Sequence, residues 1–320
     1  MNDSYTRNPG KEDYPAPIMI KIDNLTKVFS KKQGPAIDSV SLEVQNSEIV
    51  GFVGLNGAGK TTTIRVAAGV SLPTSGSASV DGYDLVAQKM EASKRIGWVP
   101  ETPNFDPNGR AISLMKYFAG FYGISEGEAV SRSSTLLKSV GLEGSETKKI
   151  SAYSQGMKKR FSLAASMLGD PQNFLFDEVL NGLDPEGIHY FRRLMLELKE
   201  RGKAVLLSSH ILVEVESIAD RIVFIHKGRV IRSIARSELA EAGGTSMKIV
   251  VTNLDDRALA YLKGLGDLRV EGNAAFLVSK GADTARINSD LLQMGYQVSE
   301  ISQQKEGLEE YFLKLIGEAN

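Results

Sequence analysis

The feature that most constrains this chain is a glycine-rich turn that follows a short apolar segment. Glu48–Gly54 reads EIVGFVG, and its β-branched and aromatic residues are typical of a strand buried on both faces. The chain continues as GLNGAGKT over Gly54–Thr61, which fits the phosphate-loop pattern G-x-x-x-x-G-K-[ST]. In such a loop the backbone N–H groups point at phosphate oxygens, and the following helix adds the positive end of its dipole. The sequence therefore predicts a nucleoside triphosphate site in an α/β fold.

The side chains of this loop have separate tasks. Lys60 supplies a point charge for the β- and γ-phosphates, and the Thr61 hydroxyl is predicted to bind Mg²⁺. The residues predicted to bind the nucleotide in this segment are Gly54, Leu55, Asn56, Gly57, Ala58, Gly59, Lys60, Thr61 and Thr62.

A pair of carboxylates ends a second apolar strand. Asn173–Glu178 reads NFLFDE, and the carboxyl ends of strands are where open α/β sheets bind their ligands. Asp177 is predicted to bind Mg²⁺, directly or through water, and Glu178 to polarise an attacking water. Two adjacent carboxylates favour hydrolysis over purely structural nucleotide binding.

Strands and helices alternate along the first part of the chain, which is typical of a parallel α/β sheet. Between Thr102 and Ser151 amphipathic helical patterns dominate, and we expect a helical insert there. Further strands are predicted at Ile18–Phe29, Ser39–Val44, Asn173–Asp177 and Lys203–Ser208, and helices at Met157–Leu168 and Ile188–Glu200.

The last part of the chain has a different order of elements. After a linker near Ala242–Ser246 the patterns predict strand, helix, strand, strand, helix and strand, a split βαβ arrangement, followed by one amphipathic helix. These elements are expected at Met247–Thr252, Arg257–Leu265, Leu268–Glu271, Ala274–Ser279, Ala282–Met294, Tyr296–Ile301 and Gly307–Ile316.

Length and composition narrow the class of protein. A chain of 320 residues fits two domains or one large α/β domain. Lys plus Arg total 38 and Asp plus Glu 39, so the chain lacks the overall positive charge of a dedicated nucleic-acid binder. No stretch reaches the about 18 apolar residues of a membrane-spanning helix, and the polar segment 1–17 is not a secretory signal. With no cysteine in the sequence, we expect a cytoplasmic protein.

Three further motifs follow in a characteristic order. Tyr153–Met157, YSQGM, resembles the signature LSGGQ, Asn181–Asp184, NGLD, resembles a D-loop, and Ser208–His210 resembles a switch-histidine loop. Together with the phosphate loop and the acidic pair, they make Ile18–Ser237 resemble the nucleotide-binding subunit of an ATP-binding cassette (ABC) transporter. The resemblance implies a P-loop NTPase cassette with a mixed sheet and a helical subdomain, followed here by a small C-terminal α+β domain. From the resemblance together with the composition and element patterns, the bounds we expect are 1–17 for a disordered lead-in, 18–240 for the cassette, 102–170 for its helical subdomain and 246–320 for the accessory domain.

The resemblance also implies a mechanism that needs two cassettes facing head to tail. Each ATP would lie between the phosphate loop of one copy and Ser154–Gly156 of the other, with Glu178 as general base and His210 touching the γ-phosphate. Phe29 matches the aromatic residue that stacks on adenine, although it also fits an ordinary core position. The implied nucleotide-binding residues are Phe29, Tyr153, Ser154, Gln155, Gly156 and Asp184; the catalytic residues Glu178, His210 and Lys60; and the metal ligands Thr61, Glu101 and Asp177.

The chain departs from the commonest family pattern in places. Glu101 stands where a Gln ligand is usual, Gln155 replaces a glycine of the signature, and Tyr153 replaces its leucine. After Glu178 the chain has Val179–Leu180 instead of Pro-Thr. We still expect hydrolysis, while a degenerate site that binds ATP and turns it over slowly stays open.

The helix expected after the signature motif carries three consecutive basic residues, Lys158–Arg160. We interpret them as a solvated helix face, with attraction of phosphate as the alternative. Phe161, Leu163 and Leu168 would then face the interior.

The family resemblance implies a membrane partner as well as a second cassette. The implied partner is a separately encoded integral-membrane permease, because the sequence around the motifs is most similar to subunits paired with export-type permeases, and the chain is expected at the cytoplasmic face of the membrane. An aromatic cluster, Tyr117–Tyr122, could line the docking groove or belong to the helical core. The alternatives are an ABC ATPase acting on ribosomes or DNA and an ATP-gated assembly module.

Overall fold

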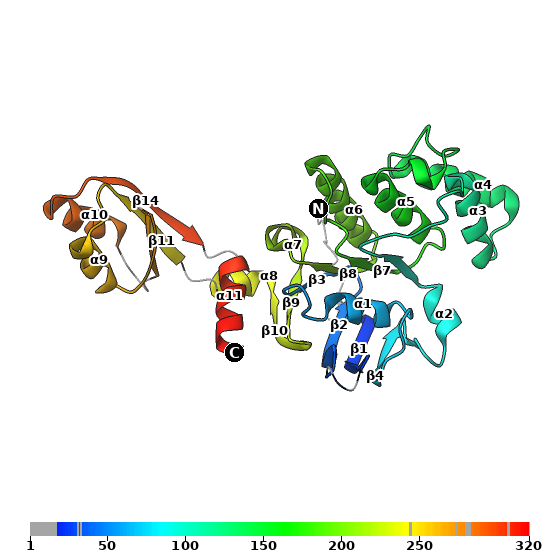
Figure 1. Cartoon of the computed structure of the whole chain (residues 1–320), viewed down its shortest axis with the longest axis horizontal. Helices are drawn as coiled ribbons and strands as arrows, with labels where there is room; N and C mark the ends of the chain where they lie inside the picture. The colour runs from blue at the N-terminus through cyan, green and yellow to red at the C-terminus, as the bar shows by residue number, and fades with distance from the viewer. Residues whose placement is uncertain are drawn as a thin grey trace, which may run out of the picture.

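The structure is a computed structural model that describes residues 18–30, 32, 34–242, 245–272, 274–278, 283–305 and 308–319. The predicted lead-in 1–17 and positions 243–244 of the predicted linker lie outside the described residues. Strands of the described part form three sheets, with two of them close together and the third set apart at the other end (Figure 1).

A mixed six-stranded sheet forms the centre of the cassette. The order of its strands is β10-β9-β3-β8-β7-β6; β10 pairs antiparallel with β9, and the other neighbours pair in parallel. Because parallel neighbours need a crossover, helices connect them and cover the sheet. The strands are β3 (Ile49–Val53), β6 (Ile96–Val99), β7 (Asn173–Asp177), β8 (Ala204–Ser209), β9 (Arg221–His226) and β10 (Arg229–Ala235).

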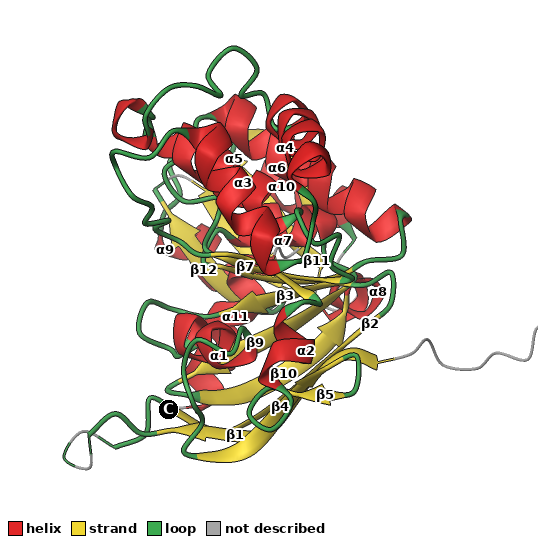
Figure 2. Ribbon diagram, turned by 90° about the vertical axis from the view of Figure 1, so that its right-hand side faces the viewer, coloured by secondary structure: helices red, strands yellow, loops and turns green. Residues whose placement is uncertain are grey.

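A second, antiparallel sheet lies below the central sheet, on the side opposite most helices (Figure 2). Its order is β2-β1-β4-β5, and polar residues alternate with apolar residues along its long strands, as expected when one face meets the core. The strands are β1 (Ile18–Lys27), β2 (Ile37–Gln45), β4 (Ser75–Val80) and β5 (Tyr83–Asp84).

Helices close the other face of the central sheet, while α1 lies between the two sheets (Figure 2). Among the described residues, no helix combines the length and the apolar character that a membrane crossing requires. The helices of this part are α1 (Lys60–Ala67), α2 (Lys89–Ser93), α3 (Ala111–Phe121), α4 (Glu126–Ser139), α5 (Gln155–Ser166), α6 (Pro185–Glu200), α7 (Leu212–Ile218) and α8 (Arg236–Ala242), with a single 3₁₀ turn at Ile150–Ala152.

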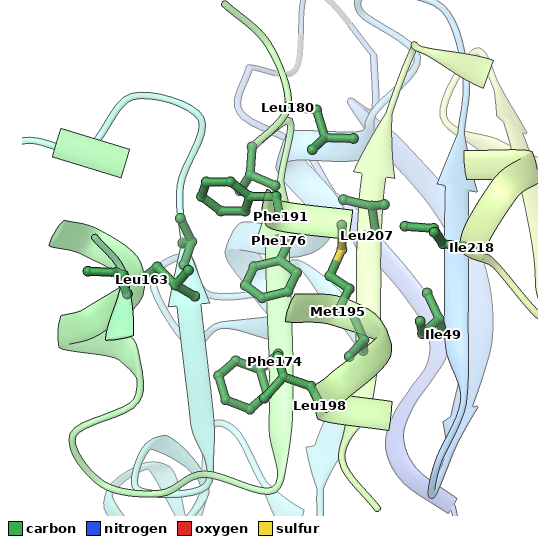
Figure 3. Packing of buried hydrophobic residues seen from close by; sticks show 14 of the residues in the cluster. Ile49, Leu163, Phe174, Phe176, Leu180, Phe191, Met195, Leu198, Leu207 and Ile218 are labelled. Carbon is green, nitrogen blue, oxygen red and sulfur yellow. The ribbon is translucent and has the colours of Figure 1, made fainter. Parts of the chain in front are cut away.

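The central strands are buried on both faces, as their continuous apolar sequences predict. In β7 the rings of Phe174 and Phe176 point into the helical layer, whereas Leu175 joins the core between the two sheets. Figure 3 shows these two rings beside Phe191 and Met195 of α6. This packing holds the end of β7 in place, and that end carries the acidic pair.

The C-terminal sheet confirms the expected βαββαβ order. Its strands are ordered β12-β13-β11-β14, with all neighbours antiparallel, and a separate core lies beneath its helices. The elements are β11 (Thr245–Val251), α9 (Asp256–Lys263), β12 (Asp267–Glu271), β13 (Ala274–Val278), α10 (Thr284–Gln293), β14 (Val298–Lys305) and α11 (Leu308–Ala319).

The last helix, α11, returns to the cassette. Leu308 and Phe312 belong to the cassette core, and the Phe312 ring stacks on Phe224 of β9 with ring centres 5.6 Å apart. The backbone N–H of Leu308 also donates to Glu216 of α7 at 3.2 Å. The expected accessory domain 246–320 therefore ends in a helix that packs on its neighbour, and its bounds remain a proposal.

Candidate functional site

Four parallel strands of the central sheet end along one edge, and each leads into a predicted site segment. In the register of the sheet Val53 pairs with Ser209, Asp177 with Ser208, and Val99 with Phe176. The phosphate loop follows β3, the acidic pair ends β7, the histidine loop follows β8, and Glu101 follows β6. The sheet thus brings together residues that lie far apart in the sequence.

Two glycines give the phosphate loop its shape. Gly59 has a φ of 112° and precedes α1, and a Cβ there would lie 2.7 Å from the Ile37 side chain. Gly57 has a φ of 80°, with open space where a Cβ would stand. Both backbone conformations disfavour residues with a side chain, so the loop depends on glycine at these positions.

Lys60 is almost fully buried and points back across the loop. Its Nζ donates to the carbonyl oxygens of Gly54 at 2.7 Å and Leu55 at 3.3 Å, and it lies 3.0 Å from Glu178 Oε1. The loop carbonyls hold the ammonium group in the mouth of the loop, where the pattern predicts phosphate contact. The ion pair with Glu178 balances its charge inside the protein.

Asp177 is held by two hydroxyl groups. The hydroxyls of Thr61 and Ser208 donate to the same carboxylate oxygen, at 3.0 and 2.9 Å. Burial raises the pKa of Asp177, the two hydrogen bonds lower it, and the charges of Glu178 and Glu101 raise it further. Carboxylate and hydroxyl oxygens are ligands that Mg²⁺ favours, so the adjoining Thr61 and Asp177 fit a magnesium site.

Glu178 is the most heavily contacted group of the site. It has a φ of 49°, a left-handed conformation uncommon for a residue with a side chain. Besides Lys60, its carboxylate accepts from Asn181 Nδ2 at 3.1 Å and from the His210 backbone N–H at 3.3 Å, and it lies 2.9 Å from His210 Nδ1. Contacts from three loops therefore fix one carboxylate.

A cavity of about 370 Å³ opens above these groups. Its walls join the phosphate loop to the carboxylates, and Glu101 lies on the far side, where the Asn181 amide donates to it at 3.4 Å. The cavity has room for a polyphosphate group, and its oxygen-rich wall fits a magnesium ion. The lining residues are Ala36, Asn56, Gly57, Gly59, Lys60, Thr61, Thr62, Glu101, Glu178 and Asn181.

The signature motif lines a different cavity, of about 400 Å³. Ser154 caps α5 by accepting from the Met157 N–H at 3.2 Å, and Asp184 caps α6 by accepting from Gly187 N–H at 2.9 Å. Gln155 and Gly156 line this cavity as well, together with Gly141, Arg160, Gly182 and Leu183. No residue lines both cavities.

The remaining predicted binding residues have different surroundings. Phe29 is 67% exposed, and the Lys27 ammonium lies 5.1 Å from its ring centre, so the structure does not bury this ring in the core. Leu55 is also exposed, whereas Ala58 is buried. Tyr153 packs inside the core and its hydroxyl donates to the Ser145 carbonyl at 2.9 Å, so its side chain reaches neither cavity.

Sequence reasoning missed three residues that shape the site. Ser208 donates to Asp177 and accepts from the Glu178 N–H at 3.1 Å, and Asn181 bridges Glu178 and Glu101. The prediction that Lys159 lies on a solvated helix face is wrong, because the residue is only 5% exposed. No local pattern marks a lysine as buried, because the partners of Lys159 come from a distant loop.

Comparisons with known proteins agree with this geometry. The sequence pattern of the family described as ABC transporter matches residues 37–181. The chain is 33% identical over 304 residues to the bacitracin transport ATP-binding protein BcrA of Bacillus licheniformis, covering 93% of this chain and 97% of that protein. It is 36% identical to the ABC transporter ATP-binding protein NatA of Bacillus subtilis, covering 70% of this chain and 92% of the relative. The chain belongs to the ABC transporter ATP-binding family.

Solved structures of ATP-binding cassettes are similar to the cassette part of this chain. An ATP-binding subunit of an ABC transporter superposes with a TM-score of 0.64 at 30% identity, covering 70% of this chain and 92% of that one. A dimeric ATP-binding cassette bound to ADP and phosphate after hydrolysis superposes with a TM-score of 0.63 at 25% identity, covering 68% and 99%. This ABC protein is therefore an ATPase subunit of a transporter, and the ribosome, DNA and assembly alternatives are not supported.

We predict that Ser208→Ala weakens MgATP binding by about tenfold, since a hydrogen bond to a charged group contributes about 1.5–3 kcal/mol. The change removes one donor from Asp177 and the side-chain acceptor of the Glu178 N–H. Ser166→Ala, at a buried serine of α5 that donates to Leu163, is the matched control and should leave affinity unchanged. Titration calorimetry measures both, and equal affinities in the two variants would contradict the prediction.

Proposed function

We propose that two cassettes of this kind pair head to tail and hydrolyse MgATP between them. The observation that carries the proposal is the separation of the two cavities within one chain. Part of the phosphate loop lines one together with Glu101 and Glu178, and Ser154, Gln155 and Gly156 line the other. A second cassette, either another copy or a paralogue, would supply the signature face to each phosphate loop.

The signature face has the chemistry to cap a phosphate. The twelve-residue helix α5 begins at Gln155, and the N-terminus of a helix attracts anions through its dipole and free N–H groups. Its first turn holds no acidic residue that would oppose an anion. A γ-phosphate bound in the loop of a facing cassette would therefore meet favourable charge.

The residues of the phosphate cavity divide the work of hydrolysis. When ATP binds, the Lys60 ammonium would leave its ion pair with Glu178 and pair with the β- and γ-phosphates. The Glu178 carboxylate would then be free to accept a proton from the attacking water. His210 and Asn181 would keep that carboxylate oriented while Lys60 moves. Mg²⁺ held by Thr61 and Asp177, with Glu101 nearby, would neutralise charge on the phosphate oxygens.

We expect Glu178→Gln to lower kcat at least about 100-fold, because an amide cannot take the proton and a general base contributes about 10²–10⁴. The variant should bind MgATP and accumulate as a dimer in size-exclusion chromatography with light scattering. Glu200→Gln, at the exposed end of α6, is the matched control and should behave as the wild type. Undiminished turnover in Glu178→Gln, or a variant that stays monomeric with MgATP, would contradict the proposal.

We further propose that the chain drives export through a separate permease at the cytoplasmic face of a membrane. Relatives are named for bacitracin transport, linearmycin resistance and Nod factor export. On α3 the rings of Tyr117 and Phe121 are 65% and 66% exposed. Phe121 also lines a groove of about 350 Å³ with Trp98, Phe118 and Tyr122. An exposed aromatic surface of this kind is typical of a protein contact.

The double variant Tyr117→Ser/Phe121→Ser should lower the fraction of the chain that sediments with membranes of its native cells, because it removes two exposed aromatic anchors. Val130→Ser is the control, since Val130 is 41% exposed on the neighbouring helix α4 and lies outside the groove. Quantitative immunoblotting of membrane and supernatant fractions provides the measurement. An unchanged membrane fraction in the double variant would rule out this surface.

A further inference from the structure

Lys159 stands out among the buried lysines of the described residues, which are Lys60, Lys159 and Lys203. Lys60 and Lys203 each form an ion pair, with Glu178 at 3.0 Å and with Asp170 at 2.9 Å. The Lys159 ammonium instead donates to backbone carbonyls: Val179 at 3.0 Å, Glu178 at 3.5 Å, and Asn181. Its three N–H donors meet three acceptors on one short turn.

In the Glu178–Asn181 turn the side chains of Glu178 and Asn181 have their own partners, while Lys159 binds three of the four backbone carbonyl oxygens. The turn starts with the left-handed Glu178, and its next two side chains, Val179 and Leu180, are apolar and fully buried. Burying a turn removes its carbonyl oxygens from water, and each needs a donor to avoid a desolvation cost. Lys159 supplies donors for three of them from α5, the helix that begins within the signature motif.

The charge of Lys159 also has partners at the site. Burial lowers the pKa of Lys159, while the charges of Glu101 and Glu178 raise it. Asp177, Glu178 and Glu101 give the site three carboxylates, and Lys60 lies close to Glu178 alone at 3.0 Å. Lys159 donates to the Asn181 carbonyl, and the Asn181 side-chain amide donates to Glu101 at 3.4 Å, so this second buried cation is placed to offset part of the negative charge.

We propose that Lys159 is a positioning residue that ties helix α5 to the Glu178–Asn181 turn and balances the charge of Glu101. This inference rests on the proposed hydrolysis by Glu178, because it explains how that carboxylate is aimed. Within one chain, the clamp joins the signature helix, which would serve one ATP, to the general base, which would serve the other. The Lys159 ammonium contacts the backbone carbonyl of Glu178, and its proposed role needs no contact with the Glu178 carboxylate or with ATP.

The test is a double-mutant cycle between Lys159→Met and Glu101→Gln, measured as steady-state ATP hydrolysis. Lys159→Met should lower kcat about 10- to 100-fold, the scale of a small misplacement of a catalytic group, with KM for ATP within about threefold. Adding Glu101→Gln should restore part of the lost kcat, because it removes the charge that Lys159 balances. A purely structural lysine would give costs that add in the double variant.

Lys203→Met is the matched control, since it removes another buried lysine that pairs with Asp170 outside the site. It should lower the free energy of unfolding without a specific loss of kcat. Lys159→Gln serves in the same cycle if Lys159→Met does not fold, and failure of both variants to fold would overturn the proposal. Unchanged kcat in a folded Lys159 variant, or no rescue by Glu101→Gln, would also overturn it. If the wild type itself does not hydrolyse ATP, the proposed function fails instead.

Discussion

The parallel register of the central sheet is the constraint on which the site depends. β3, β8, β7 and β6 run in one direction and end together, so each loop that leaves them arrives at the same edge. The two faces of these strands pack into different cores, so a shift in register by one residue would exchange their side chains between the cores and separate the motifs. The fold thus positions the phosphate loop, the carboxylates and the histidine loop before any ligand contact is made.

The charged side chains at this edge of the central sheet are arranged so that their charges are balanced inside the protein. Glu178 and Lys60 are each about 5% exposed, and a buried ion pair is tolerated only when further hydrogen bonds satisfy both partners. Loop carbonyls hold the ammonium group, while Asn181 and His210 hold the carboxylate. In the turn that follows Glu178, the Lys159 ammonium is likewise held by backbone carbonyls. Every charged group here is thereby oriented by neighbours from another segment.

Much of the fold and of the candidate site could be predicted from the sequence, because local patterns indicate the strand ends and the motifs. The strand predicted at Asn173–Asp177 is observed with those bounds, and Asn56, Gly57 and Gly59–Thr62 of the predicted loop residues line the cavity. The polar strand Ser75–Val80, SGSASV, has no apolar run to reveal it and is held by pairing with β1. Tyr153 and Lys159 are buried through contacts with Ser145 and with Val179, and α11 packs on the cassette. Such contacts depend on tertiary packing that a single sequence does not display.

The central claim, that each ATP site is built by two chains, is tested most directly by mixing two inactive variants. Lys60→Met disables the phosphate loop, and Gly156→Asp disables the signature face without crowding the fold, since a Cβ at Gly156 would lie no closer than 3.8 Å to its neighbours. A mixed dimer holds one site with an intact loop from one chain and an intact signature from the other. The account predicts that the mixture hydrolyses ATP well above either variant alone. A mixture as inactive as its separate components would contradict it.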